Sequence, residues 1–369
     1  MKKVLVVFGT RPEAIKMCPL ILELQKCEQI ICKVCLTGQH REMLMQVMDV
    51  FGICADYNLD IMGINQNLST ITISVLEKLG ALLDEERPEL LLVHGDTSTS
   101  FAAALAGFYR QIPIGHVEAG LRTYHMYSPY PEEFNRQAVD LISDLYFAPT
   151  ELARKQLLME NKKPDRIFVT GNTVIDALKN TVTDNYFNEH LTWAEDSRLI
   201  LLTSHRRENI GKPMRNIFRA VKRIAHDFPD VKIIYPIHKN PNVREIAYSI
   251  MNNEERIRMI EPLDVFDFHN FMARSFLIMT DSGGIQEEAP ALGKPVLVMR
   301  ENTERPEGVE AGTLKLVGIE EDTIYDETRK LLTDKESYQS MCHAVNPYGD
   351  GHASKKIVQA ILHYFCSQD

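Results

Sequence analysis

Basic residues do not outnumber acidic ones in this sequence, which weighs against a nucleic-acid partner. Its 369 residues include 41 lysines and arginines against 51 aspartates and glutamates, a formal net charge of −10. Binding to a nucleic-acid backbone relies on basic residues that neutralise phosphates. We therefore expect no nucleic acid as a partner, and an anionic ligand would need a local basic site.

Long apolar runs are missing as well. No run approaches the ~20 residues that cross a bilayer, and the start, MKKVLVVFGTRPEA, turns polar after the length of one strand. We therefore expect no membrane segment, no signal peptide and a cytoplasmic location.

Motifs that hold a metal or a dinucleotide are also lacking. The seven cysteines include one close pair, Cys32 and Cys35, in the segment ICKVCL. That segment is typical of a strand, on which residues three apart point to opposite faces and cannot share a metal ion. No second CxxC follows, the odd number of thiols does not suit a secreted disulfide framework, and no strand is followed by GxGxxG. We expect buried structural thiols, no metal site and no bound cofactor.

The composition and the order of apolar segments predict an α/β protein of two domains. Hydrophobic residues make up 44% of the chain and charged residues 25%, and the length is about two and a half times a typical domain of ~150 residues. Short apolar runs alternate with segments of helical period such as 12–26, 68–86 and 213–227, which is typical of parallel sheets built from βαβ units. The expected strands are 4–8, 34–36, 90–93, 145–147, 167–169, 199–202, 233–235, 276–279 and 296–299.

The polar segment 179–197 is the expected domain boundary. It contains TDNYFNEHLTWAEDS and separates two of the apolar runs. We therefore assign residues 1–178 to an N-terminal domain and residues 179–352 to a C-terminal domain. The tail, 353–365, has the period of an amphipathic helix.

Polar side chains follow many of the expected strands. Open parallel sheets bind ligands at the carboxyl ends of their strands, so polar strand ends in both halves predict an active site in the cleft between the two domains. The segments concerned are GTR at 9–11, TGQH at 37–40, HGD at 94–96, HVE at 116–118, SHRR at 204–207, His238 and DSGG at 281–284.

Two segments suit a phosphate or a diphosphate. In DSGGIQEEAPALGKP, the turn at 282–284 joins a strand to a helix whose free amides attract an anion, and Glu288 one turn later could accept hydrogen bonds from a ribose. A helix simply capped by Ser282 is the structural alternative. In FGTRPEA, Arg11 and Lys16 place two cations at the start of a helix, where the helix dipole favours anions instead. This placement indicates phosphate binding; the alternative is that both cations are simply exposed to solvent.

Acidic residues at the strand ends are candidates for proton transfer. Asp96, Glu118, Glu132 and Glu133 come from neighbouring segments, and crowding is expected to raise the pKa of some of these carboxyl groups into a useful range. The alternatives are local: Asp96 could cap a helix that begins near residue 97, and the two glutamates could form an ordinary acidic first turn.

Two histidines belong to strand ends of the second half. His205 lies in TSHRREN beside Arg206 and Arg207, where an imidazole could protonate or stabilise a leaving phosphate. A structural role is its alternative. The same placement applies more weakly to His238 in YPIHKNPNVRE.

Taken together, these segments resemble the non-hydrolysing UDP-N-acetylglucosamine 2-epimerases of bacteria. The resemblance covers nearly the whole chain in the family's order, and the combination is specific although SGG or HRRE alone is not. It runs through FGTRPEAIK, TGQHREML, HGDTSTS, GHVEAGLRT, YSPYPEEFNRQ, VTGNTVIDAL, TSHRREN, TDSGGIQEEAPALGKPVLV, ERPEGVEAGT and NPYGDG.

The resemblance implies a GT-B-like fold of two Rossmann-like domains, with the C-terminal helix, 353–369, packing back onto the first. It also implies a homodimer without a cofactor, UDP-N-acetylglucosamine and UDP as ligands, and a place in cell-surface polysaccharide biosynthesis. Carried over by motif, the catalytic residues are Asp96, Glu118, Glu132 and His205. The implied nucleotide contacts are Arg11, Lys16, Phe268, Ser282, Gly283, Gly284, Glu288 and Arg305. Phe268 alone would be typical of a core, and its packing against uracil rests on the resemblance.

The resemblance further implies allosteric activation by UDP-N-acetylglucosamine at a second site beside the catalytic one. The matching positions are Gln39, Glu42, Arg206 and His238. Asn65 departs from the pattern, because some members carry an arginine there.

The implied reaction is reversible epimerisation at C2 through elimination. C2 adjoins no carbonyl group, so its hydrogen is not acidic. In the implied reaction, the loss of this hydrogen as a proton is therefore coupled to the departure of UDP from C1. The 2-acetamidoglucal that forms takes UDP back with protonation on the other face, which gives UDP-N-acetylmannosamine. A hydrolysing epimerase, a GT-B glycosyltransferase that needs an acceptor, and a noncatalytic sugar-nucleotide sensor are the alternatives; Asp96, Glu118 and Glu132 together speak against the sensor.

Overall fold

The computed structural model of the chain describes residues 1–38, 41–62 and 67–367. It divides into two compact units. The first consists of Met1–Asn180 and Tyr348–Asp369, and the second of Thr181–Pro347. The chain therefore crosses from one unit to the other twice, after residue 180 and after residue 347.

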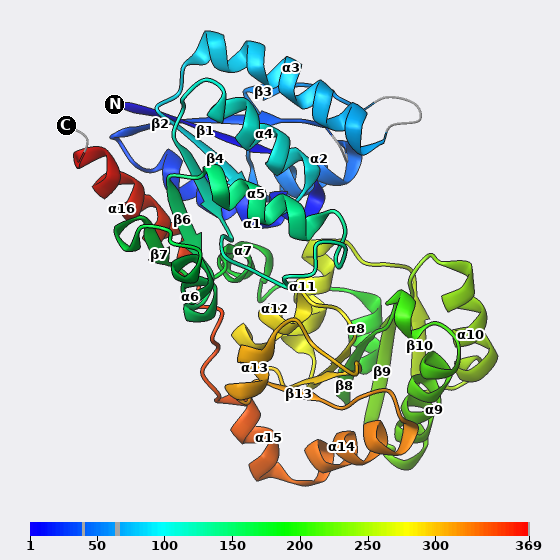
Figure 1. Cartoon of the computed structure of the whole chain (residues 1–369). Helices are drawn as coiled ribbons and strands as arrows, with labels where there is room; N and C mark the ends of the chain where they lie inside the picture. The colour runs from blue at the N-terminus through cyan, green and yellow to red at the C-terminus, as the bar shows by residue number, and fades with distance from the viewer. Residues whose placement is uncertain (39–40, 63–66, 368–369) are drawn as a thin grey trace. The chain divides into compact units, whose positions relative to one another are not determined.

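The first unit is built on a seven-stranded sheet in the order β3-β2-β1-β4-β5-β6-β7 (Figure 1). Every neighbouring pair is parallel, as the alternation of strands and helices predicts. The strands are β1 (Lys2–Phe8), β2 (Ile30–Leu36), β3 (Tyr57–Asn58), β4 (Leu90–His94), β5 (Ile114–Val117), β6 (Leu145–Ala148) and β7 (Ile167–Val169).

Helices α3 and α4 cover one face of this sheet. Val75, Leu79 and Ala103 from these helices join Leu5 and Val7 of β1 in one buried apolar cluster. Helix α1 packs against β2, α2 and the C-terminal helix α16. The helices of this unit are α1 (Arg11–Gln25), α2 (Arg41–Phe51), α3 (Leu68–Glu86), α4 (Ser98–Phe108), α5 (Glu132–Ile142), α6 (Glu151–Met159), η1 (Pro164–Arg166), α7 (Thr173–Thr181), whose last residue is the first of the second unit, and α16 (Ala353–Cys366).

The second unit is built on a six-stranded parallel sheet in the order β10-β9-β8-β11-β12-β13. Phe218 and Ile224 of α9 pack on this sheet with Tyr235 of β9 and Met279 of β11. The strands are β8 (Arg198–Thr203), β9 (Val231–Pro236), β10 (Ile257–Ile260), β11 (Leu277–Thr280), β12 (Val296–Val298) and β13 (Leu314–Leu316). The helices are α8 (Glu189–Ala194), η2 (Arg207–Asn209), α9 (Lys212–Asp227), α10 (Pro241–Met251), α11 (Val265–Arg274), α12 (Ile285–Ala291), α13 (Pro306–Glu310), α14 (Glu321–Thr333) and α15 (Lys335–Cys342).

The predicted fold class is confirmed, because both units are parallel-sheet α/β units. Each expected strand overlaps an observed one. Four observed strands lie outside the expected ranges: β3, β5, β10 and β13 have only two, four, four and three residues.

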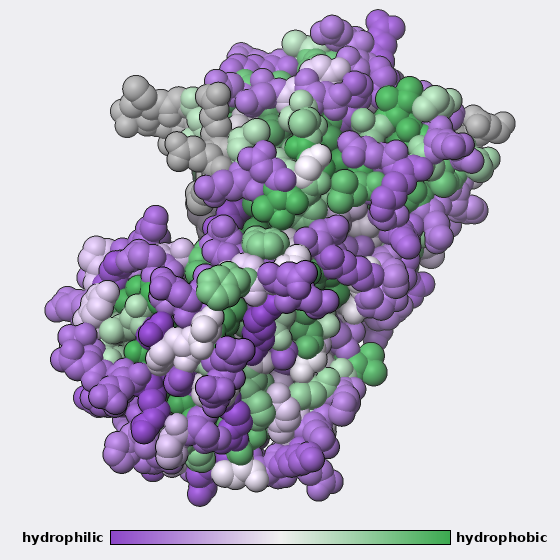
Figure 2. Space-filling model, turned by 180° about the vertical axis from the view of Figure 1, so that it is seen from behind, coloured by the Kyte–Doolittle hydropathy of each residue, from purple (hydrophilic) through white to green (hydrophobic). Residues whose placement is uncertain are grey.

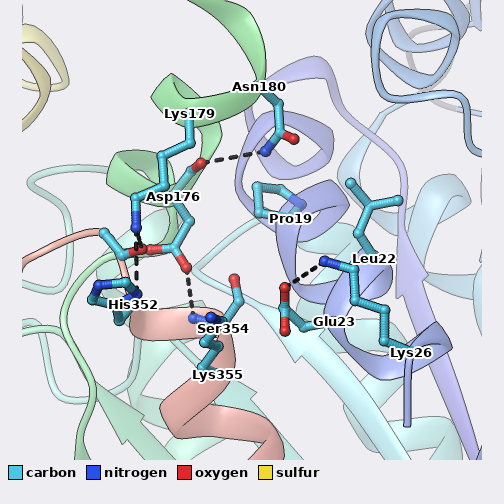
Figure 3. A pocket seen from close by; sticks show the side chains of 11 residues that line it. Pro19, Leu22, Glu23, Lys26, Asp176, Lys179, Asn180, His352, Ser354 and Lys355 are labelled. Atoms are coloured by element: carbon cyan, nitrogen blue, oxygen red, sulfur yellow. Dashed lines mark hydrogen bonds and ion pairs between the residues drawn. The ribbon is translucent and has the colours of Figure 1, made fainter.

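The returning chain is fastened to the end of α7 (Figure 3). Asp176 accepts hydrogen bonds from the backbone N–H groups of Ala353, at 3.1 Å, and Ser354, at 2.8 Å. Lys179 donates a hydrogen bond to the carbonyl oxygen of Gly351. These residues line a cavity of about 210 Å³ together with side chains of α1. The start of α16 is thus held by α7 before the helix packs on α1.

The two close cysteines are free thiols, of which Cys35 is buried and Cys32 is partly buried. Cys32 and Cys35 lie on β2 as free thiols, and burial raises the pKa of each to about 12. Among the described residues, no group of three or more His, Cys, Asp or Glu side chains could hold a metal ion. No helix in the same part of the chain is both long and apolar enough to cross a membrane. The face seen in Figure 2 is largely hydrophilic, with scattered apolar residues.

Gly120, which follows β5, gives a stability prediction. Its φ is +87°, and a Cβ there would lie 2.4 Å from the carbonyl oxygen of Ala153 in α6. Gly52 also has a positive φ, +64°, but a Cβ would meet nothing within 4 Å. Both alanine variants carry about 1–2 kcal/mol of left-handed strain. Gly120→Ala should lose about 1–3 kcal/mol more, since the backbone of α6 must move.

Urea unfolding followed by circular dichroism measures both variants against the unaltered chain. Gly52→Ala is the matched control for backbone strain. Equal losses in the two variants would contradict the close approach of this loop to α6.

Candidate active site

The expected site residues lie at the carboxyl ends of strands in both units. In the first unit they follow β1, β4 and β5 and open α5; in the second they follow β8, β11 and β12. Each set is described within its own unit.

Glu118 is the centre of the first set. It follows β5 directly, has a left-handed φ of +68° and has a side chain that is 10% exposed. One of its carboxylate oxygens, Oε2, faces three donors: Lys16 Nζ as an ion pair, His94 Nε2 at 3.1 Å and Asn172 Nδ2 at 3.2 Å. A left-handed non-glycine residue costs about 1–2 kcal/mol, and these contacts hold it in place.

The electrostatics of Glu118 differ from the expectation of crowded carboxylates with raised pKa values. Burial raises its pKa, but Lys16 and His94 outweigh burial and hold the pKa of Glu118 well below its usual range. The pKa of Glu133 is lowered as well, since hydrogen bonds and Arg136 outweigh its burial. The expectation is therefore wrong for both glutamates, because the structure pairs each carboxylate with donors and cations instead of with another acid.

Asp96 is bound by the helix that carries the glutamates. Arg136 of α5 donates from Nη2 to Asp96 Oδ2 at 2.5 Å, and Asn135 donates to the backbone carbonyl of Asp96 at 2.9 Å. Asp96 does not cap α4, because Thr97 is the N-cap and accepts from the N–H of Ser100. The capping alternative is therefore wrong, and the Asp96 side chain, which is 27% exposed, pairs with Arg136.

Glu132 and Glu133 have different surroundings although they adjoin. Glu133 is fully buried and accepts hydrogen bonds from the N–H groups of Thr123 and Tyr124, both at 3.0 Å, so it holds the preceding loop. Glu132 is half-buried, and its carboxylate has no hydrogen bond or ion pair with any described residue. Arg11 is likewise half-buried and has no such side-chain partner in the described ranges. Within the described ranges, these two groups are thus the charges of the first set that have no side-chain partner.

A buried charge network holds the two loops that carry Asp96 and Glu118. His116 Nδ1 lies 2.7 Å from Asp140 Oδ1, and His116 Nε2 lies 2.8 Å from the carbonyl oxygen of Gly95. The two ring nitrogens thus each face an acceptor oxygen. Asp140 also accepts from the N–H of Gly120 at 3.1 Å and pairs with Arg122 at 2.8 Å. Burial raises the pKa of Asp140, but His116 and Arg122 lower it below its usual range.

Asp281 organises the second set. It is fully buried at the end of β11, and Oδ2 accepts from the N–H groups of His205 at 2.9 Å and Arg206 at 3.0 Å. The Ser204 hydroxyl at 3.2 Å and the Asn209 amide at 3.1 Å donate to the same oxygen. The loop after β8 is therefore fixed beside the glycine turn after β11.

The His205 ring lies between a carboxylate and a second imidazole. Its Nδ1 is 3.5 Å from Asp281 Oδ1, and its face stacks on His238 with ring centroids 5.5 Å apart and planes inclined by 15°. Burial lowers the pKa of His205, and His238 and Arg206 add to this effect against Asp281. Burial thus favours the neutral form of His205, in which Nε2 accepts when Nδ1 carries the hydrogen toward Asp281 and donates in the other tautomer.

The turn at 282–284 is open rather than capped. The N-cap of α12 is Gly284, without a side-chain cap, so Ser282 does not cap the helix as the alternative supposed. Gly284 has an ordinary φ of −65°, and a Cβ on Gly283 would lie 3.4 Å from Arg206 Nη2. Missing side chains therefore leave room at this turn beside a guanidinium group.

The remaining expected nucleotide contacts lie around this turn in the same unit. Phe268 on α11 is half-buried instead of being a core residue. Glu288 Oε2 lies 3.5 Å from Nε2 of His269, which is 1% exposed. Arg305 forms an ion pair with Glu287 through Nε, so its side chain is already engaged.

Among the expected regulatory residues, Gln39 and Asn65 lie outside the described residues, and the side chain of Glu42 on α2 does as well. Arg206 and His238 are described above. Four residues that sequence reasoning did not single out belong to these sets: His94, Asn172, Asp281 and His269. The first three lie in the motifs HGD, TGNT and DSGG of the sequence. Their buried contacts cannot be predicted from the spacing of residues along the chain.

The depressed pKa of Glu118 predicts a pH-dependent stability. Because the pKa of Glu118 is lower in the folded state than in the unfolded state, its ionised carboxylate stabilises the fold. This stabilisation is complete above the unfolded-state pKa of ~4.3. It is lost as the pH falls through the folded-state pKa. Glu118→Gln should therefore lower the free energy of unfolding by roughly 1–3 kcal/mol at pH 7, the cost of donors left without a partner. The difference should shrink below about pH 4.

Urea unfolding from pH 3 to pH 8 measures this difference. Glu132→Gln is the matched control, since Glu132 has no hydrogen-bonding partner among the described residues. A Glu118→Gln loss that stays constant over the whole range would argue against ionised Glu118 as a source of stability.

Comparison with known proteins assigns the chain to a family. A family model described as UDP-N-acetylglucosamine 2-epimerase matches residues 22–362. The chain is 56% identical to a curated UDP-N-acetylglucosamine 2-epimerase of Bacillus subtilis strain 168, over 98% of this chain and 96% of the relative.

Solved structures agree in fold over the full length. A UDP-GlcNAc 2-epimerase from Neisseria meningitidis bound to UDP-GlcNAc has a TM-score of 0.88 and 48% identity, covering 98% of this chain and 100% of the other. The Methanocaldococcus jannaschii enzyme in complex with UDP-GlcNAc and UDP has a TM-score of 0.79 and 34% identity, covering 99% and 100%. As its motifs and its two parallel sheets indicate, this chain belongs to the UDP-N-acetylglucosamine 2-epimerase family and is an epimerase.

Proposed function

We propose that the chain interconverts UDP-N-acetylglucosamine and UDP-N-acetylmannosamine by eliminating UDP and adding it back, without net hydrolysis. The observation that carries the proposal is the paired charge at one sheet edge: ionised Glu118 with Lys16 and His94, and Asp96 with Arg136. Proton-transfer groups and cations are both needed when a proton and a diphosphate leave the same sugar.

The reaction balances without an external oxidant. A base takes the C2 proton, the C2–H electrons form the C1–C2 double bond, and the C1–O bond breaks so that UDP leaves with its electron pair. Addition of UDP to C1 with protonation of C2 on the other face completes the exchange. Oxidation at a neighbouring carbon would need a dinucleotide, and the sequence has no GxGxxG at a strand end.

The first unit supplies the groups for proton transfer in this proposal. Glu118, Asp96 and Glu132 are the candidate acids and bases, and Glu132 is the carboxylate that no described residue engages. Arg11 is the matching uncommitted cation for the diphosphate. We assign neither face of the sugar to a particular carboxylate.

The second unit supplies nucleotide contacts. The open turn at 282–284, the adjacent Arg206 and the neutral His205 ring suit a diphosphate, Glu288 suits ribose hydroxyls, and half-buried Phe268 suits uracil. Relatives bound to UDP-GlcNAc and UDP support this choice of ligand. The proposal requires one nucleotide sugar to contact residues of both sets.

Three further expectations stay predictions from the resemblance. They are a homodimer, a cytoplasmic location with a role in cell-surface polysaccharide biosynthesis, and activation by UDP-N-acetylglucosamine. A relative in complex with both UDP-GlcNAc and UDP supports the search for a second nucleotide site. The stacking of His238 on His205 brings one expected regulatory residue against an expected catalytic one.

Exchange with solvent tests the reaction. In heavy water, UDP-N-acetylglucosamine alone, with neither NAD nor metal added, should equilibrate with UDP-N-acetylmannosamine and acquire deuterium at C2, measured by proton NMR. Epimerisation with full retention of the C2 hydrogen would rule out proton transfer at C2. Accumulation of free N-acetylmannosamine would favour the hydrolysing alternative, and an absolute need for an acceptor would favour a glycosyltransferase.

Substitutions separate catalysis from nucleotide binding. Asp96→Asn, Glu118→Gln, Glu132→Gln and His205→Asn should each lower kcat by roughly 100-fold or more, as loss of acid-base or charge-stabilising groups does. Arg11→Ala should instead weaken UDP binding, measured by titration calorimetry, because its expected partner is the diphosphate.

Glu23→Gln is the control on the same helix as Arg11, since the charged partner of Glu23 among the described residues is exposed Lys26. Arg305→Ala is also expected to weaken UDP binding, but it strips a partner from buried Glu287 and so needs a parallel stability measurement. Near-normal turnover in any one of the four variants would remove that residue from the catalytic set.

A further inference from the structure

His269 stands behind the carboxylate that is expected to bind the ribose. It lies on α11, is 1% exposed and directs Nε2 toward Glu288 Oε2, 3.5 Å away. On the other side of the ring, Nδ1 lies 2.6 Å from the hydroxyl oxygen of Thr181, the first residue of the second unit. The ring therefore joins two groups within one unit.

The partners of the ring settle where its hydrogen lies. A carboxylate oxygen can only accept, so the nitrogen that faces Glu288 carries the hydrogen. The Thr181 hydroxyl can donate to the other nitrogen, which then needs no hydrogen. A ring with its Nε2–H aimed at Glu288 and its Nδ1 accepting from Thr181 satisfies both neighbours, and Thr181 favours this tautomer.

The two carboxylate oxygens of Glu288 have different surroundings among the described residues. Oε2 faces His269, whereas Oε1 lies 3.7 Å from the place that a Cβ of Gly284 would occupy. Oε1 thus faces the open glycine turn. A carboxylate with a ring N–H beside one oxygen still has free lone pairs on both oxygens. These lone pairs can accept hydrogen bonds from two neighbouring hydroxyl groups.

We propose that His269 is a positioning residue that orients Glu288 toward the ribose hydroxyls of the uridine nucleotide and so lets the site distinguish ribose from deoxyribose. The inference rests on the nucleotide site of the proposed function. His269 touches no substrate in this account; it acts through Glu288.

The segment that His269 contacts does not depend on it. Asn270 donates to the carbonyl of Thr181 at 2.7 Å and accepts from the N–H of Thr183 at 3.1 Å. Arg274 donates to the carbonyl of Thr183 at 2.8 Å. Loss of the His269 ring therefore leaves this segment bound to α11, and variants at His269 are expected to fold.

Titration calorimetry with UDP and 2′-deoxy-UDP tests the proposal. The unaltered chain should bind UDP at least about 10-fold more tightly, because a hydrogen bond to a charged group is lost with the 2′-hydroxyl. His269→Leu should cut this preference to less than about 3-fold by weakening UDP while leaving 2′-deoxy-UDP nearly unchanged. His269→Gln, whose amide can donate to Glu288, should restore part of the preference.

A double variant shows whether the two residues act together. If His269 acts through Glu288, His269→Leu combined with Glu288→Gln should discriminate no worse than Glu288→Gln alone. Thermal unfolding of each variant reports whether the fold is kept.

Full retention of the ribose preference in His269→Leu, or equal weakening of both nucleotides, would overturn the inference and leave the proposed function standing. Equal affinity of the unaltered chain for UDP and 2′-deoxy-UDP would overturn it together with the role of Glu288. Deuterium exchange at C2 is measured separately, so a failure of the epimerase reaction itself is recognised independently.

Discussion

A buried carboxylate must be given hydrogen-bond donors, and this constraint shapes both site halves. Asp281 gathers the loop after β8, Glu133 the loop before α5, and Asp140 the loop after β5. Asp176 does the same for the start of α16, and Glu118 collects three donors from separate segments. Each acid would destabilise the fold if its donors were absent. The buried acids therefore hold these loops through their backbone N–H groups.

The fold was largely predictable from the sequence because its signals are local. Alternating apolar runs and helical segments predict parallel sheets, and residues 68–86 coincide with α3. The strands outside the expected ranges, β3, β5, β10 and β13, have two to four residues. Such a segment is too short to show a hydrophobic periodicity. It becomes a strand because an adjacent strand supplies backbone groups for hydrogen bonding.

The site was predictable as a set of positions but not as a set of partners. Strand ends and motifs point to Asp96, Glu118 and His205, because the carboxyl ends of parallel strands share one edge. They do not reveal that Lys16 on α1 reaches Glu118 from about a hundred residues away in the chain, or that His269 lies behind Glu288. Such contacts depend on how helices pack, which spacing along a chain does not encode.

The partners of Glu118, which the sequence did not reveal, set its pKa and therefore its strength as a base. A carboxylate whose pKa is held low is stable as an anion but is a weak base, and the C2 hydrogen of the sugar is hard to remove. In the proposed reaction a diphosphate enters beside Lys16 and Arg11, and its charge competes with Glu118 for Lys16. If Lys16 interacts with the diphosphate, its interaction with Glu118 weakens. The pKa of Glu118 then rises, and Glu118 becomes a stronger base. Substrate binding would thus make Glu118 a stronger base, and the cation that pairs with Glu118 in this structure would also stabilise the leaving group.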